Sequence, residues 1–224
     1  MRRHPFLFLL CLSIVGAASV ARAIESAWDE PVDVTFTARC DGSEQKYVLM
    51  LPALFDRNEP ATLMVALHGH GSDRWQFIRD RRDECRALRY AASSGIMIFV
   101  APDYRAKTSW MGPKAEADLL QILDELQKEY RIRHTLLCGG SMGASAALTF
   151  AALHPDRVDG VVALNGTANH VEYEGFQDAI AASFGGGKTE VPDEYRRRSA
   201  ELQSDRLTMP IAAMQSDGDW ESPF

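Results

Sequence analysis

The sequence predicts a single α/β domain: a mostly parallel sheet with helices on both faces. Apolar runs of strand length alternate with longer helical patterns along most of the chain, a spacing that is typical of parallel strands joined by right-handed crossovers. The 224 residues are enough for one domain with a substantial core. In addition, reactive side chains follow several of the predicted strands, which is where such sheets bind ligands.

The predicted elements follow one another in a regular order. Apolar alternation at 32–39 and 45–51, with a turn at 41–43 between them, predicts an antiparallel hairpin at the edge of the sheet. Later strands are predicted from short apolar runs at 61–67, 96–100, 135–138, 158–164 and 209–214. Helical periodicity predicts helices at 73–92, 113–130, 144–153, 175–182 and 192–204.

The stretch around Ser141 is the most informative part of the sequence. Gly139-Gly140-Ser141-Met142-Gly143 matches G-x-S-x-G and lies between a predicted buried strand and an Ala-rich helix. A serine on such a sharp turn has its side chain directed outward, and glycines on either side avoid a Cβ clash. The N–H of Met142, at the start of the helix, can donate to an oxyanion. We therefore expect Ser141 to be a nucleophile.

Other reactive residues fall at the same predicted edge of the sheet. They follow the carboxyl ends of the predicted strands and comprise His68-Gly69-His70-Gly71, Asp103, His170 and Asp219. His134 and His154 do not belong to this edge. They lie roughly 23 Å from Ser141 along the strand and roughly 20 Å from it along the helix, so structural roles are expected for both.

The N-terminus has the pattern of a secretory signal peptide. A basic start at Arg2-Arg3 precedes an apolar segment, and Ala21-Arg22-Ala23 forms an A-x-A cleavage site. The apolar segment is short for a membrane span, so no stable membrane anchor is expected. We expect residues 1–23 to be removed, leaving a secreted or periplasmic domain at 24–224.

Composition limits the partners. Cleavage removes three arginines and no acidic residue, so the net charge changes from −7 to −10, which argues against binding to nucleic acid or anionic membranes. Cys138 is expected in the core. Cys40 and Cys85 could form a disulfide in an oxidising compartment, and the sequence does not decide whether they do. No spacing of Cys and His suggests a metal, and no cofactor is expected. The oligomeric state is left undetermined.

Taken together, the motifs resemble the α/β-hydrolase family. H-G-H-G at 68–71, S-W-M-G-P at 109–113, G-G-S-M-G at 139–143 and S-D-G-D at 216–219 look like its prolyl-oligopeptidase-related, esterase-like branch. The resemblance implies that Ser141 attacks an acyl carbonyl and that Asp219, or else Asp217, orients the catalytic histidine. It also implies an oxyanion hole made by the N–H groups of Met142 and His70, with Gly71 close by.

The chain departs from this family at its end. The family places a histidine beyond the acid, but no histidine follows His170 in this sequence. The sequence therefore predicts a sheet that is incomplete at its C-terminal edge, truncated before the catalytic-histidine loop and nearly inactive as written. His170, and similarly His70, remains a possible surrogate base at the correct edge of the sheet.

Three functions are compatible with these patterns. The first is hydrolysis of carboxylic esters through an acyl-enzyme on Ser141, with pocket walls from Trp110, Trp220 and the 171–207 region. The second is cleavage of short peptides, and the third is a non-catalytic binding protein on the same fold. A nucleotide site at Gly185-Gly186-Gly187-Lys188-Thr189 is excluded because Ala182 occupies the position of the first P-loop glycine.

Overall fold

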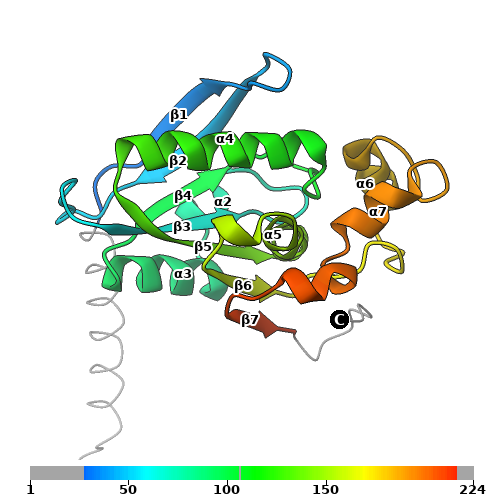
Figure 1. Cartoon of the computed structure of the whole chain (residues 1–224). Coiled ribbons are helices and arrows are strands. Elements are labelled where there is room, and N and C mark those ends of the chain that lie inside the picture. The colour runs from blue at the N-terminus through cyan, green and yellow to red at the C-terminus, as the bar shows by residue number, and fades with distance from the viewer. Residues whose placement is uncertain (1–27, 106, 216–224) are drawn as a thin grey trace, which may run out of the picture.

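The sheet runs through the whole domain in the computed structural model, which describes residues 28–105 and 107–215 (Figure 1). The described residues form a seven-stranded sheet of order β1-β2-β4-β3-β5-β6-β7. β1 (Val32–Thr37) and β2 (Glu44–Met50) form the predicted antiparallel hairpin, and β2 pairs antiparallel with β4 (Ile98–Pro102). All later pairs are parallel, so the predicted fold class is confirmed.

The parallel part of the sheet is built from five strands. They are β3 (Ala61–Leu67), β4, β5 (Ile132–Gly140), β6 (Gly160–Leu164) and β7 (Ile211–Met214). β3 and β5 lie at the centre. β3 is a nearly continuous apolar run, as is expected of a strand that is covered on both faces, whereas β5 is apolar only in its second half, at Leu136, Leu137 and Cys138. Ser141 follows β5 directly, so the candidate nucleophile stands on a central strand.

Helices cover both faces of the sheet, as expected. α4 (Pro113–Glu129) and α5 (Met142–Leu153) pack on one face, against Leu63, Val65 and Leu67 of β3. α2 (Gln76–Arg79) and α3 (Asp83–Ser94) pack on the other, where the alternate β3 residues Met64 and Ala66 point. Every residue of α5 is buried, and its many alanines allow the helix to approach the sheet closely.

The last helices lie together at one end of the domain. α6 (Gln177–Phe184) and α7 (Pro192–Arg198) stand beside each other in Figure 1, outside the layer formed by α4 and α5. Short 3₁₀ helices follow α5 at Pro155–Arg157 and α7 at Ala200–Arg206. None of the helices within the described residues combines the length and hydrophobicity that a bilayer span requires.

Two predicted helices are divided in the structure. The 73–92 pattern becomes α2 and α3, because Asp80 has an extended backbone and interrupts the helix. The 192–204 pattern becomes α7 and a 3₁₀ helix, separated by the extended Ser199. Tyr90, an apolar position of the predicted 73–92 helix, is 53% exposed because α3 turns it outward.

β7 forms the edge of the sheet opposite the hairpin. It pairs with β6 along its whole length, and all four of its residues are exposed. The sheet is therefore open on this side among the described residues.

Candidate active site

Ser141 occupies a strained turn between β5 and α5. Its backbone has φ +54° and ψ −121°, a conformation that non-glycine residues rarely adopt. A β-carbon on Gly139 would lie 2.2 Å from the backbone carbonyl carbon of Gly143, so the turn has no room for a side chain at position 139. The residue itself is exposed although its helical neighbours are buried. The turn therefore presents the serine outward, as the G-x-S-x-G pattern predicts.

Ser141 opens into a pocket of about 550 Å³ at the carboxyl ends of the strands. Its wall includes residues at or just after the ends of three strands: Gly69 and His70 after β3, Leu164 and Asn165 at the end of β6, and Met214 and Gln215 at the end of β7. Arg82 and Glu84, at the start of α3, add charged groups to the wall and form an ion pair at 3.3 Å. The carboxyl ends of the strands, where the sequence predicts the reactive side chains, thus form a pocket beside Ser141.

The H-G-H-G segment lies against the serine turn. A β-carbon on Gly69 would be 3.9 Å from Cβ of Ser141 and 3.4 Å from the carbonyl oxygen of Gly140. The N–H of Gly69 is held by Oε1 of Gln76 at 2.8 Å. Among the described residues, neither the N–H of His70 nor that of Met142 has a hydrogen-bond partner. Two backbone donors near the serine are therefore unoccupied.

Gly71 has a different role from the one expected. Its N–H donates to the carbonyl oxygen of Lys107 at 2.7 Å, and its φ of +80° suits glycine. This N–H is consequently occupied, and the expectation of Gly71 as an oxyanion donor is corrected. The bond instead ties the H-G-H-G segment to the loop between β4 and α4, which we call the β4–α4 loop (residues 103–112).

A second tie between these two loops is the ion pair of Arg74 and Asp103. Asp103 accepts from the backbone N–H of Arg74 and from its Nη1, both at 2.9 Å. Arg74 also reaches Asp33 on β1 at 2.7 Å. Asp103 lies at the reactive edge as predicted, but it holds the loops together and does not line the Ser141 pocket.

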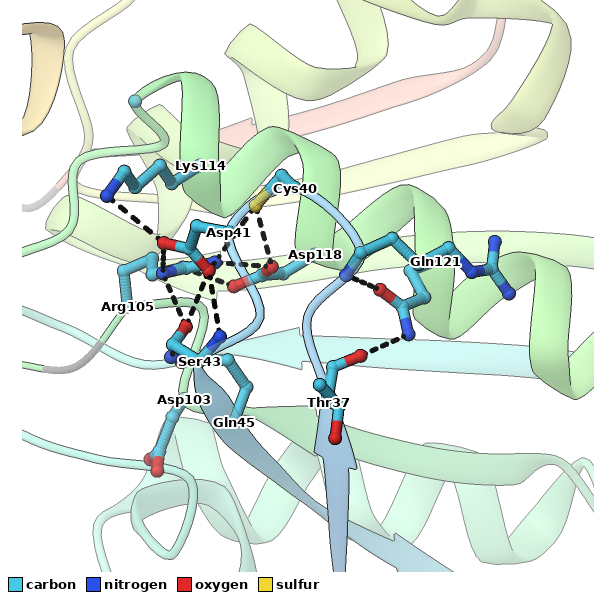
Figure 2. A network of polar contacts seen from close by, with 12 residues as sticks. Thr37, Cys40, Asp41, Ser43, Gln45, Asp103, Arg105, Lys114, Asp118 and Gln121 are labelled. Carbon is cyan, nitrogen blue, oxygen red and sulfur yellow. Dashed lines mark hydrogen bonds and ion pairs between the residues drawn. The ribbon is translucent and has the colours of Figure 1, made fainter.

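The β4–α4 loop is anchored by Arg105 (Figure 2). Arg105 donates to both oxygens of Asp118 on α4 at 2.5 and 2.8 Å, and to Asp41 in the hairpin turn at 2.8 Å. Asp118 is only 1% exposed, so this is a largely desolvated bidentate pair. Hydrogen bonds from Arg105 and Ser43 hold the pKa of the Asp41 carboxyl far below its usual range. Sequence patterns did not reveal this anchor, because its three residues are distant in the chain.

Trp110 lies in the same loop but not on the surface of the Ser141 pocket. It is 2% exposed, and its indole Nε1–H donates to Nδ1 of His70 at 3.2 Å. The expectation of Trp110 as a pocket wall is therefore corrected: it stands behind His70. Phe176, whose ring is centred 4.2 Å from that of His70, lies in the 171–207 region that was expected to contribute to the site, but the sequence did not single it out.

His170 is placed in the core and not at the serine. It is fully buried, its Nε2 lies 3.4 Å from the hydroxyl of Thr149, and its ring packs against Trp110 and Phe184. Burial lowers the pKa of His170 to about 3, so the ring is neutral. Because it neither lines the pocket nor contacts Ser141, the idea of His170 as a surrogate base is corrected.

The remaining histidines have structural contacts. His134 pairs with Asp159 at 3.3 Å, and His154 with Glu116 at 2.8 Å, in agreement with the roles expected for them. His68 is buried, with its ring nitrogens near the carbonyl oxygens of Gly69 and Asp103. Within residues 28–105 and 107–215, no histidine forms a hydrogen bond with Ser141.

The other expected groups can be placed only in part. Asp219, its alternative Asp217 and Trp220 lie outside the described residues, as does the signal sequence. Cys138 is buried in β5 as expected, whereas Cys40 and Cys85 are both free thiols. In the part of the chain that the structure describes, no three His, Cys, Asp or Glu side chains gather as metal ligands would.

Comparisons with known proteins identify the same fold. Residues 63–213, about two thirds of the chain, match the sequence profile of the family described as alpha/beta hydrolase fold. No curated protein matches the sequence significantly.

Solved structures share the fold at low sequence identity. An S-formylglutathione hydrolase from Agrobacterium tumefaciens superposes with a TM-score of 0.67 at 16% identity, over 84% of this chain and 76% of its own. A ferulic acid esterase from Anaeromyces mucronatus gives 0.58 at 18% identity, over 87% and 86%. A Bacteroides ovatus protein described as a dipeptidyl aminopeptidase IV gives 0.66 at 17% identity; the match covers 84% of this chain but only 28% of that longer one.

Proposed function

Since the chain belongs to the alpha/beta hydrolase fold family, we propose that it is a serine hydrolase that cleaves small carboxylic esters. The observation that carries the proposal is the exposed Ser141 on its left-handed turn, beside two unoccupied backbone N–H groups. This combination supplies a nucleophile and donors for the oxyanion that its attack creates. A mere glycine-rich turn has no need of an outward serine in a strained backbone.

In the proposed reaction, Ser141 Oγ attacks the ester carbonyl and the alcohol leaves, forming an acyl-enzyme that water then hydrolyses. The N–H groups of Met142, at the start of α5, and of His70 stabilise the oxyanion. Asp219 is proposed as the acid of the triad, on the strength of its position after β7. No described histidine is assigned as the general base.

An ester is favoured over a peptide as the substrate. The matched esterase structures are similar in length to this chain, whereas the dipeptidyl aminopeptidase is several times longer. The pocket of about 550 Å³ has room for a small acyl or aromatic group. We further propose that the domain is exported, because of the signal pattern at residues 1–23.

The test is hydrolysis of p-nitrophenyl acetate by the protein expressed from its complete gene. We expect turnover that Ser141→Ala reduces by at least about 10³-fold. Ser145→Ala is the matched control, because Ser145 is the next serine of α5 and is buried away from the pocket. Faster turnover of a proline-containing dipeptide amide than of the ester would instead favour a peptidase. Equal rates of ester hydrolysis for the wild type and Ser141→Ala would contradict the serine mechanism.

A further inference from the structure

The hydrogen bond between Trp110 and His70 determines where the imidazole carries its proton. An indole nitrogen can only donate, so His70 Nδ1, which receives the bond at 3.2 Å, must present its lone pair. The neutral ring then carries its proton on Nε2. Thus the contact with Trp110 selects one of the two tautomers.

The geometry of Trp110 leaves it little freedom to release this bond. The indole is 2% exposed, and its ring packs against His170, Tyr173 and Phe176. Both Trp110 and Met111 have positive φ, +50° and +56°, a strained pair that persists only where the surroundings impose it.

Contacts on both sides of Trp110 impose this backbone. Arg198 donates to the carbonyl oxygen of Met111 at 2.7 Å, and Arg105 anchors the start of the loop on Asp118. The indole is therefore a fixed donor.

The second ring nitrogen of His70, Nε2, is available to a ligand. His70 lines the Ser141 pocket and is partly exposed, and Nε2 points away from the nitrogen that Trp110 occupies. Phe176 covers one face of the ring at 4.2 Å and limits its rotation. Among the described residues, Nε2 has no hydrogen-bond partner. A protonated nitrogen without a protein acceptor thus stands at the wall of the pocket.

We propose that Trp110 holds His70 as the Nε2–H tautomer and that this N–H donates a hydrogen bond to an oxygen of the ester bound at Ser141. His70 is then a substrate-binding donor and Trp110 its positioning residue. The inference rests on the proposed ester hydrolysis for its kinetic part. It also opposes a role for His70 as general base, since the nitrogen left free by Trp110 already carries a proton.

The tautomer can be tested without any substrate. ¹⁵N-resolved spectra of the imidazole, assigned by loss of the signals in His70→Gln, should show a protonated Nε2 and an unprotonated Nδ1. Trp110→Phe removes the indole N–H and should give a mixture of tautomers. Trp28→Phe is the matched control, because the Trp28 N–H is buried without a partner among the described residues and its ring packs against Phe99, in a different core cluster from Trp110. A wild-type ring protonated on Nδ1 would overturn the proposal.

The donor role is tested by kinetics on p-nitrophenyl esters. His70→Phe keeps a ring beside Phe176 but loses the N–H, and it should lower kcat/KM about 10- to 100-fold, as expected for a lost hydrogen bond to a developing charge. His70→Gln retains a side-chain N–H and should recover part of this loss, which a purely structural role would not predict.

The two hypotheses fail in different ways. Unchanged kcat/KM in His70→Phe, with activity still lost in Ser141→Ala, would overturn the donor and leave the nucleophile intact. Full activity in Ser141→Ala would overturn the proposed function, while the spectra would still decide the tautomer. Since the wild-type spectra and the two His70 variants require no change at Trp110, poor folding of Trp110→Phe would not remove the test.

Discussion

Gly143 and Leu67 are in such close contact that no side chain fits between them: a β-carbon on Gly143 would lie 1.9 Å from the carbonyl oxygen of Leu67. Leu67 ends β3 and Gly143 is the second residue of α5. This contact therefore presses the start of α5 against the strand that leads into the H-G-H-G segment. The proximity of Ser141 to Gly69 and His70 is a consequence.

Gly143→Ala should separate these two elements. Because the carbonyl oxygen of Leu67 belongs to the backbone and cannot rotate away, we expect the free energy of unfolding to fall by about 1–3 kcal/mol or more, and the rate of ester hydrolysis to fall with it. Gly140→Ala is the matched control, since a β-carbon there would meet nothing closer than 4.0 Å. Urea unfolding of both variants provides the measurement, and equal stability of the two would contradict the contact.

The buried ion pair between Glu116 and Arg198 should make stability depend on acid pH. Burial alone would raise the pKa of Glu116, but hydrogen bonds from His154 and Arg197, with the charge of Arg198, outweigh it and lower the pKa to about 2. A carboxyl with a depressed folded pKa stabilises the protein above its unfolded value near 4.5 and loses this contribution as the pH falls from there toward 2.

Glu116→Gln should remove that pH dependence and also destabilise the fold. Arg198 is fully buried and would lose a charged partner, at a cost of about 3–5 kcal/mol. The comparison is urea unfolding of both proteins between pH 6 and 3. A variant with the same pH slope as the wild type would show that Glu116 does not carry the effect.

His170 should behave as a buried neutral group and not as a base. With its pKa lowered to about 3 by burial, the folded protein excludes a proton that the unfolded chain takes up near pH 6.5. Its favourable contribution is thus complete above pH 6.5 and declines as the pH falls toward 3. The NMR signals of His170 should not titrate between pH 8 and 5.

The same burial predicts a small effect of His170→Phe on catalysis. The new ring can keep the edge contacts with Trp110 and Phe184, and the residue does not reach the Ser141 pocket. We expect kcat/KM for p-nitrophenyl acetate to change only a few-fold. A loss of about 10³-fold or more in a folded variant would restore His170 as a candidate base.

Export should produce a mature chain that starts at Ile24. The A-x-A pattern at Ala21-Arg22-Ala23 predicts cleavage there, and mass spectrometry of the protein from the producing cell's periplasm or medium tests it. Recovery of the uncleaved N-terminus in the cytoplasm would contradict the predicted secretion.

Much of the fold was predictable because short stretches of sequence determine its strands, helix starts and turns. β3 and the second half of β5 are short apolar runs, and Pro113 marks the start of α4. The serine turn was predictable because the two glycines of G-x-S-x-G are a steric requirement of that turn.

The surroundings of the serine were less predictable because they depend on long-range contacts. The bond from Trp110 to His70 and the Arg105–Asp118–Asp41 anchor join residues whose spacing shows no periodicity. Sequence alone also placed His170 at the correct edge of the sheet but could not show that it is buried. Similarly, Gly71 is in the expected loop, but the partner of its N–H depends on the neighbouring loop.

Covalent labelling of Ser141 tests most directly whether this residue is the nucleophile. The protein expressed from its complete gene is treated with a fluorophosphonate, digested and analysed by mass spectrometry, with Ser141→Ala as the control. We expect one phosphonylated peptide that contains Ser141 and is absent from the control. An unmodified Ser141 in folded protein, or equal labelling of the control, would contradict the claim that this residue is the nucleophile.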